Sequence, residues 1–326
     1  MMRNSADAAA QMACGAARCE EVIAALEEAI RRQPADALRL YQLGLCYGGG
    51  CRAHSLTSPL MAAEYLKRAL NQASAGGLLR ASILDALGNT RIRCGDRQRD
   101  AALRDAIACH TEASGIYRAA GNFDDWARTQ FNLGNSCCEL SEATGEDHWG
   151  EAVSHYEKAL EVRTRKRDPE RYAAVLENLG TAYRRLPGTA SAENVKKAIA
   201  CYRLALRACP QATHPARNAA LENNLGNAFL SMPATAGVAA GRNARLALWH
   251  FNHALRIQAA GKHECAYGIT QYNRAQAYLR LAGSRGRNAE AALDCLEDAY
   301  AVFDQCGERR YAELAKKQLA QIGRGP

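Results

Sequence analysis

The stretch LENNLGNAFLSM, residues 221–232, recurs in altered form at three earlier positions of this 326-residue chain. The copies read QFNLGNSCCEL at 130–140, LENLGTAYRRL at 176–186 and, more faintly, LDALGNTRIRC at 84–94. The Leu-Gly pairs place glycines 44, 46, 46 and 46 residues apart, and an alanine follows in the same slot after a further 49. These slot residues are Gly44, Gly88, Gly134, Gly180, Gly226 and Ala275. A period this regular predicts a solenoid of stacked structural repeats.

Each repeat has a second, amphipathic half. After the Leu-Gly segment and a turn rich in Gly, Pro, Ser or Asn, apolar residues recur at helical spacing, as at Ala152, Tyr156 and Ala159. Hydrophobic residues form 48% of the chain but aromatic residues only 6%, which favours a helical interior of Ala and Leu. Each repeat is therefore predicted to be a helix, a loop and a second helix. Because glycine inside a helix costs roughly 1 kcal/mol relative to alanine, we expect it to permit close approach of two helices.

Residues 133–160 read LGNSCCELSEATGEDHWGEAVSHYEKAL, in which Leu-Gly is followed in the next helix by Ala-x-x-x-Tyr-x-x-Ala-Leu. This pattern resembles the tetratricopeptide repeat, except that Cys137 stands where the family usually has an aromatic residue. The resemblance covers about residues 35–322 and implies an all-α superhelix (solenoid) of about six helix pairs with a C-terminal capping helix. The repeat exceeds the usual 34 residues and in this resembles the long repeats of bacterial proteins and of kinesin light chain.

The repeats divide the chain into three parts. We expect an N-terminal helical remnant or cap at 1–34, a repeat array at 35–306, and a C-terminal capping helix and tail at 307–326. The array's units are expected near 35–77, 78–121, 122–168, 169–212, 213–261 and 262–306.

Asparagines recur at two slots beside the glycine. At roughly 100° per residue, Asn132 and Asn135 fall on the side of their helix opposite Gly134 and Cys137, so they face away from the core. In a two-layer solenoid the first helices line the inner surface, and this side becomes a groove wall. An amide both donates and accepts hydrogen bonds, as the backbone of an extended peptide requires. Alternatively, these asparagines bond to the neighbouring helix and hold the repeat geometry; the sequence leaves both interpretations open.

The candidate partner-binding residues are these amides and the variable positions beside them. They are Asn89, Arg128, Asn132, Asn135, Glu177, Asn178, Arg184, Asn223, Asn224, Asn227, Tyr272 and Asn273. Arg184, with Arg185 and Arg280, indicates an acidic or carboxylate-bearing partner. The predicted function is a non-catalytic scaffold or adaptor that binds an extended or helical segment of a partner protein in its groove. An RNA-binding helical repeat and a small-molecule-sensing regulatory solenoid remain as alternatives.

The sequence lacks the common motifs of catalytic and nucleotide-binding sites. It contains no Gly-x-x-x-x-Gly-Lys and no Gly-x-Ser-x-Gly, and HECAY at 263–267 ends in Tyr where a zinc-protease motif requires His. Two groups of potential metal ligands match no established spacing. They are Cys46, Cys51 and His54, and His250, His253, His263 and Cys265. We therefore predict no enzymatic activity, no cofactor and no bound metal.

Charge and cysteine content give weaker indications. The net charge is +8, with 42 basic and 34 acidic residues interspersed, and the basic run 163–167 has acidic residues on both sides. This pattern disfavours nucleic acid as the main partner. The thirteen scattered cysteines, such as Cys137, Cys201 and Cys295, suggest reduced thiols that pack as small apolar residues in the cytoplasm. Without a run of 18 apolar residues we expect no membrane span, and the oligomeric state is not predicted.

Overall fold

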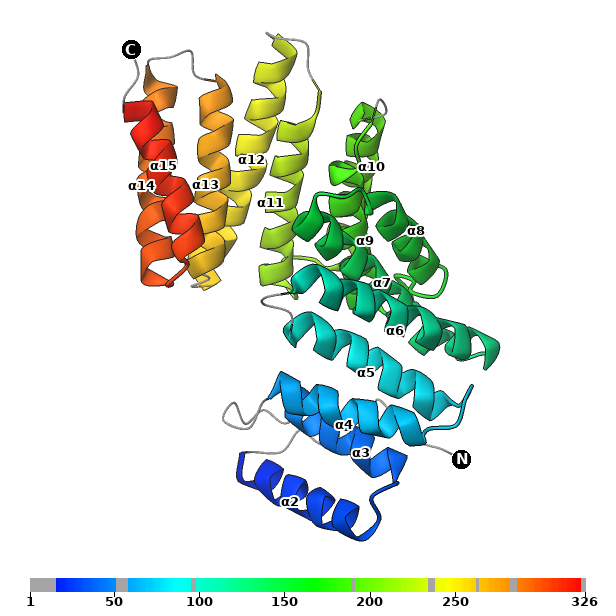
Figure 1. The fold of residues 1–326 in the computed structure, drawn as a ribbon. Coiled ribbons are helices and arrows are strands. Elements are labelled where there is room, and N and C mark those ends of the chain that lie inside the picture. The colour runs from blue at the N-terminus through cyan, green and yellow to red at the C-terminus, as the bar shows by residue number, and fades with distance from the viewer. Residues whose placement is uncertain are drawn as a thin grey trace. The chain divides into compact units, whose positions relative to one another are not determined.

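In the computed structural model the described residues form helices joined by turns and loops, and no strand occurs among them. The described residues are 16–50, 58–94, 98–188, 191–233, 238–261, 264–281 and 286–323. The chain divides into two compact units, Met1–Val162 and Arg163–Pro326, called unit 1 and unit 2 below. In each unit, helices that follow one another in sequence pack side by side (Figure 1).

Unit 1 contains one leading helix and three helix pairs. The pairs are α3 with α4, α5 with α6, and α7 with α8, and α4 and α6 each pack also on the first helix of the next pair. The bounds are α2 (Ala16–Arg32), α3 (Ala37–Leu45) continued by the short η1 (Cys46–Gly50), α4 (Pro59–Gln72), α5 (Leu78–Cys94), α6 (Arg99–Ala119), α7 (Phe123–Thr144) and α8 (Trp149–Leu160).

Unit 2 contains three further pairs and a closing helix. The pairs are α9 with α10, α11 with α12, and α13 with α14, and α15 packs on α14. The bounds are α9 (Pro169–Arg185), α10 (Ser191–Ala208), α11 (Pro215–Ser231), α12 (Val238–Gly261), α13 (Glu264–Leu281), α14 (Arg287–Gln305) and α15 (Arg309–Gly323). The described residues thus contain the predicted six helix pairs and a C-terminal helix after them.

Local sequence signals explain where several helices begin and end. Asn122 caps α7 by accepting a hydrogen bond from the backbone N–H of Asp125 at 3.3 Å. Asp168 caps α9 in the same way, and Pro169 occupies the first helical position, where no backbone N–H is needed. Gly145 ends α7 with φ 77°, in the left-handed region that glycine adopts without strain.

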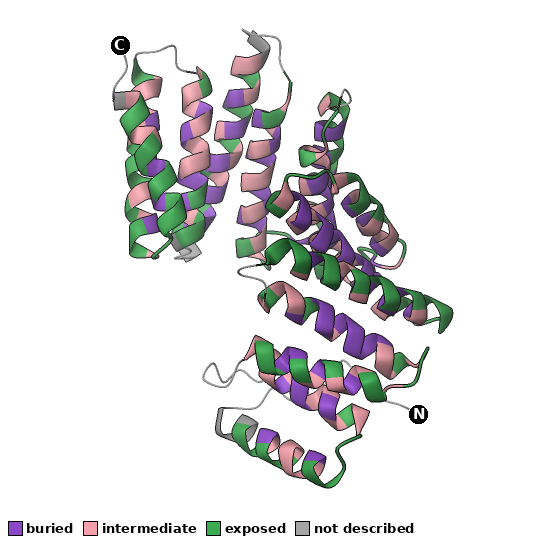
Figure 2. Ribbon diagram, in the orientation of Figure 1, coloured by how far each residue is buried: buried purple, intermediate pink, exposed green. Residues whose placement is uncertain are grey.

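At three slot glycines a ring from the second helix of the pair lies too close to leave room for a Cβ atom. A Cβ atom built on Gly134 would lie 2.5 Å from Tyr156 Cε1, and one built on Gly180 would lie 2.7 Å from Tyr202 Cε1. Gly226 meets the ring of Phe251 at 2.4 Å in the same way. These rings are fully buried, and the buried residues follow the faces by which neighbouring helices touch (Figure 2). The predicted role of the glycine, to admit a partner helix that any side chain would displace, is confirmed at these positions.

The other three pairs depart from this pattern, and in the first of them Leu66 lies opposite Gly44, where a built Cβ would lie 2.8 Å from its Cγ. His110 fills the aromatic position opposite Gly88, where a built Cβ would lie 2.6 Å from its ring. In the last pair, Ala275 packs against smaller apolar side chains of α14. The aromatic contact there has moved to Gly268, whose built Cβ would lie 3.0 Å from Phe303 Cε1.

The cysteines differ in part from the expectation of reduced thiols. Cys265, at the start of α13, forms a disulfide with Cys306, directly after α14, with 6.1 Å between the two Cα atoms. The helix pair brings these ends together although they are 41 residues apart in sequence, so composition alone did not reveal the bond. Cys137 and Cys295 are buried thiols, as predicted.

Candidate functional site

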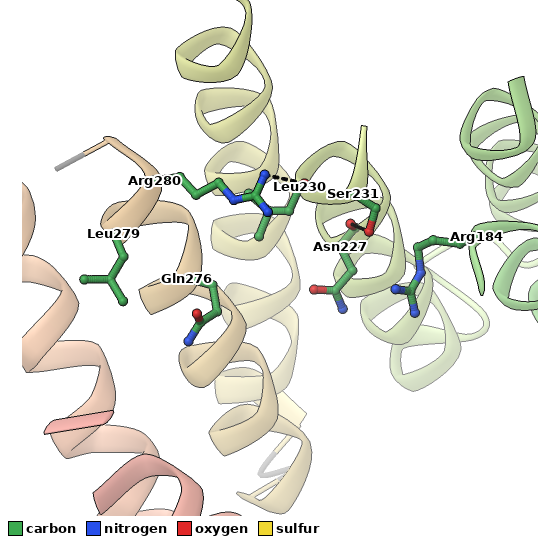
Figure 3. A pocket seen from close by; sticks show the side chains of 7 residues that line it. All are labelled: Arg184, Asn227, Leu230, Ser231, Gln276, Leu279 and Arg280. Carbon is green, nitrogen blue, oxygen red and sulfur yellow. Dashed lines mark hydrogen bonds between the residues drawn. The ribbon is translucent and has the colours of Figure 1, made fainter. Parts of the chain in front are cut away.

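A pocket in unit 2 is formed by the first helices of three consecutive pairs, α9, α11 and α13. We call it the Arg184–Arg280 pocket; its volume is about 380 Å³. Its lining residues are Arg184 from α9, Asn227, Leu230 and Ser231 from α11, and Gln276, Leu279 and Arg280 from α13 (Figure 3). Two of the predicted site residues, Arg184 and Asn227, therefore meet in one place, together with Arg280 from the predicted set of arginines.

Several polar side chains of the pocket hydrogen-bond to the end of α11 or to α15. Arg280 Nη1 donates to the backbone carbonyl of Leu230 at 2.7 Å, in the last turn of α11, where carbonyls lack a helical partner. Ser231 Oγ donates to the backbone carbonyl of Asn227 at 2.9 Å. On the other side, Gln276 exchanges two hydrogen bonds with Gln318 of α15, at 2.6 and 3.0 Å. These contacts fix the positions of Arg280, Ser231 and Gln276 at the pocket.

The lining of the Arg184–Arg280 pocket is positively charged. It contains two guanidinium groups and no carboxylate among its residues. Arg184 is half-buried, and its buried Nε has no hydrogen-bond partner in the described part of the chain. Burial raises the pKa of the neighbouring Tyr202 phenol, and the charge of Arg184 partly opposes that rise. A guanidinium matches the geometry of a carboxylate, so the pocket is suited to an acidic group.

Asn227 differs from its counterparts in the other repeats because of the aromatic residue that faces it. In unit 1 the Tyr156 hydroxyl donates to Asn135 Oδ1 at 2.7 Å, and in unit 2 the Tyr202 hydroxyl lies 3.0 Å from Thr181 Oγ1. Phe251 occupies the tyrosine position opposite Asn227 and has no hydroxyl. Within the part of the chain that the structure describes, the Asn227 amide makes no hydrogen bond, so it remains available at the pocket.

The predicted site residues of unit 1 are mostly engaged with neighbouring helices. Asp85 of α5, almost fully buried, accepts hydrogen bonds from Arg128 and from Asn132 Nδ2, the latter at 3.1 Å. His110 Nδ1 also lies 3.1 Å from Asp85. Burial opposes ionisation of Asp85, but the hydrogen bond from His110 and the charge of Arg128 prevail and lower its pKa. Asn89 is exposed on α5.

In unit 2 the same kind of contact joins consecutive first helices. Asn224 Nδ2 and Arg217 Nη1 both donate to the Glu177 carboxylate at 3.4 Å. Burial raises the pKa of Glu177, and Arg217 opposes that rise. Asn273 Nδ2 donates to Asn223 Oδ1 at 3.0 Å.

The two remaining predicted residues lie outside the pocket lining. Asn178 has an interaction partner, and Tyr272 packs half-buried against the core of the last helix pair. The site residues predicted from the sequence did not include Leu230, Ser231, Gln276 or Leu279. Gln276 follows Ala275 as Asn227 follows Gly226, so it occupies the same slot. The other three lie one turn beyond that slot, so an extended helical-wheel analysis would have placed them on that face.

Only some of the potential metal ligands lie in the described part of the chain. Among the described residues, no three His, Cys, Asp or Glu side chains converge as a metal site requires. His250 Nδ1 and His253 Nδ1 instead lie 2.6 and 3.0 Å from the carboxylate of Glu222. Burial opposes ionisation of Glu222, but these two histidines outweigh it and lower its pKa. Cys51, His54 and His263 lie outside the described residues.

Solved structures with a similar fold identify the class of repeat. The C-terminal part of a TPR repeat-containing protein from Cytophaga hutchinsonii is 15% identical, with 87% of this chain and 90% of that chain covered and a TM-score of 0.53. A Rap protein complexed with Competence and Sporulation Factor is 14% identical, with 88% and 76% covered and a TM-score of 0.50. A Signal Transduction ATPase with Numerous Domains protein with a tetratricopeptide repeat sensor, from Pyrococcus horikoshii, is 12% identical, with 91% and 44% covered and a TM-score of 0.57.

These similarities and the helix pairs show that the chain has the tetratricopeptide-repeat fold. No family profile and no curated protein matches its sequence. No helix in the described ranges combines the length and the apolar character that crossing a bilayer requires.

Proposed function

We propose that this protein is a non-catalytic interaction module that binds an acidic, extended or helical segment of a partner protein along its first helices. The observation that carries the proposal is the Arg184–Arg280 pocket, where two guanidinium groups and an available amide converge without a carboxylate. A carboxylate of the partner would pair with the arginines, and a backbone amide of the same segment would bond to Asn227. The Rap structure with its bound factor is a precedent for a chain of this fold in complex with a partner.

Fluorescence anisotropy with labelled peptides of equal length tests this proposal. We expect acidic peptides to bind more tightly than basic ones and to lose affinity as salt rises, because the contacts are ionic. Arg184→Gln and Arg280→Gln should each weaken binding by about tenfold, the effect of losing one charged hydrogen bond. Arg203→Gln is the matched control, since Arg203 is exposed on α10 and outside the pocket. Equal binding of basic peptides would contradict the proposal, as would an equal loss in the control.

A second variant removes no charge. Phe251→Tyr would place a hydroxyl opposite Asn227, as the Tyr156 hydroxyl lies opposite Asn135. That hydroxyl would hydrogen-bond to the Asn227 amide and reduce affinity for the acidic peptide. The helix pair should keep its packing, because two other pairs have a tyrosine at this position. Unchanged affinity in a folded Phe251→Tyr protein would remove Asn227 from the proposed contact.

A further inference from the structure

A second pocket in unit 2 lies between α12, α13 and α14 and shares no residue with the Arg184–Arg280 pocket. We call it the Trp249 pocket; its volume is about 680 Å³, within the range of small-molecule sites. Among its lining residues are Trp249, Asn252 and Arg256 from α12, Tyr267, Gln271 and Arg274 from α13, and Asp298 from α14.

The indole of Trp249 is an exposed aromatic surface that contacts two histidine rings. It is 59% exposed. The ring of His250 meets it edge-on with 4.8 Å between centroids, and His253 lies beside it at 5.8 Å. His250 Nδ1 hydrogen-bonds to the buried carboxylate of Glu222 at 2.6 Å, and His253 Nδ1 lies 3.0 Å from the same carboxylate. The indole is thus braced from one side while much of its surface stays open to a flat ligand.

Gln271 lines this pocket and carries a buried acceptor without a donor among the described residues. Its residue is only 1% exposed, and its Nε2 donates to the Tyr267 hydroxyl at 2.9 Å and to Asp298 Oδ2 at 2.8 Å. Because the two donors of the amide are used, its Oε1 is fixed as an acceptor. No group in the described part of the chain donates to that oxygen. A buried acceptor without a donor is unfavourable, and a ligand N–H would satisfy it.

The two arginines of the pocket have different roles. Arg274 is engaged in contacts within the protein, since its Nη1 donates to Asn252 Oδ1 at 3.2 Å and its Nε lies 3.1 Å from Cys295 Sγ. Arg256 is exposed and has no charged or hydrogen-bonded partner among the described residues. It is therefore the cation that remains available to an anionic ligand.

We propose that the Trp249 pocket binds a purine nucleotide whose base carries an exocyclic amine. The base stacks on Trp249, its amine donates to Gln271 Oε1, and its phosphate pairs with Arg256. An aromatic ring, an N–H donor and an anion within one small molecule match the three available groups of the pocket. The nucleotide is free in solution or is part of an RNA strand, and the experiment separates these sources.

Isothermal titration of the full chain with AMP tests the proposal, and a short oligoadenylate serves as the second probe. We expect saturable binding of at least one probe with a dissociation constant below about 1 mM. Binding of AMP identifies the free nucleotide as sufficient, and binding of the oligonucleotide alone identifies a strand as the source. Trp249→Ala should weaken binding at least about fivefold, as removal of an aromatic platform does. Arg256→Gln should weaken it by a similar factor and reduce its dependence on salt.

The contact with Gln271 is tested through the ligand, because a buried residue that bonds to two neighbours is itself needed for folding. Purine riboside monophosphate, which lacks the amine of AMP, should bind about tenfold more weakly to the unaltered protein. Phe123→Ala, another exposed aromatic residue, and Arg203→Gln are matched controls that should leave affinity unchanged. The proposal is overturned if neither probe binds, if the controls weaken binding as much as Trp249→Ala, or if the two monophosphates bind equally.

Discussion

Replacing Gly134 with alanine tests the packing on which every helix pair depends. The added Cβ would lie 2.5 Å from Tyr156 Cε1, about 1 Å closer than carbon atoms normally approach. The ring is fully buried, and its hydroxyl donates to Asn135 at 2.7 Å, so it cannot withdraw without loss. Overpacking costs about 1–3 kcal/mol and a weakened hydrogen bond about 1 kcal/mol, whereas alanine's helix propensity returns about 1 kcal/mol. The expected net destabilisation is therefore about 1–3 kcal/mol.

Gly115→Ala is the matched control in the same unit. Gly115 is exposed within α6, and a built Cβ would meet nothing within 4 Å, so this variant should gain about 0.5–1 kcal/mol. Urea unfolding followed by circular dichroism gives both values. Tyr156→Ala supplies the rescue, because it removes the ring atoms that the built Cβ would meet, and in that background Gly134→Ala should cost about 1–2 kcal/mol less. If Gly134→Ala stabilises unit 1 as much as Gly115→Ala, the close-approach argument is wrong.

Three further perturbations test separate parts of the structure. The Cys265–Cys306 disulfide closes a separation of 41 residues, so its reduction should destabilise the last helix pair by up to about 4 kcal/mol. The urea midpoint with and without reductant measures this effect. The midpoint of the Cys265→Ala variant should not change when reductant is added. The pKa of Asp85 is lowered in the folded protein. Its carboxylate therefore contributes fully to the free energy of unfolding above the unfolded pKa, and this contribution disappears as pH falls below about 4. Asp85→Asn should lower the free energy of unfolding by about 2–3 kcal/mol at pH 7 and make it less dependent on pH in the acid range. Burial raises the pKa of Cys137 to about 12, so mass spectrometry after iodoacetamide at pH 8 should find it alkylated only in unfolded protein.

The repeat could be predicted because close packing of the two helices limits the size of the slot residue, and small residues at a fixed interval can be seen in the sequence. A glycine repeated at intervals of 44 to 46 residues indicates positions where the partner helix leaves no room for a Cβ atom. In the last pair the aromatic contact lies at Gly268 while Ala275 fills the slot, a shift on which the sequence analysis made no prediction. The disulfide was not predictable, because which cysteines meet depends on the lengths of α13 and α14.

The candidate site was less predictable, because helix rotation gives the direction of a side chain but not the partner within its reach. Three asparagines assigned to a groove wall donate to the preceding first helix, 47 to 50 residues earlier. In each case the acceptor lies one position before the asparagine's own counterpart in the previous repeat. The pairs are Asn132 with Asp85, Asn224 with Glu177, and Asn273 with Asn223. This regularity supports the alternative interpretation for that slot, in which the amide holds neighbouring repeats together.

The second asparagine slot follows a different rule, and that rule explains why an amide without a hydrogen bond in the described part of the chain lines the Arg184–Arg280 pocket. A residue in this slot faces the aromatic side chain of its own pair, and a tyrosine hydroxyl there engages it, as Tyr156 engages Asn135. Where phenylalanine replaces tyrosine, at Phe251, Asn227 loses that partner and becomes a lining residue of the pocket. Availability of the amide is therefore decided by a residue 24 positions later on another helix. A search for functional amides in repeats of this type should compare the two helices of each pair, because conservation of the asparagine alone does not distinguish an engaged side chain from an available one.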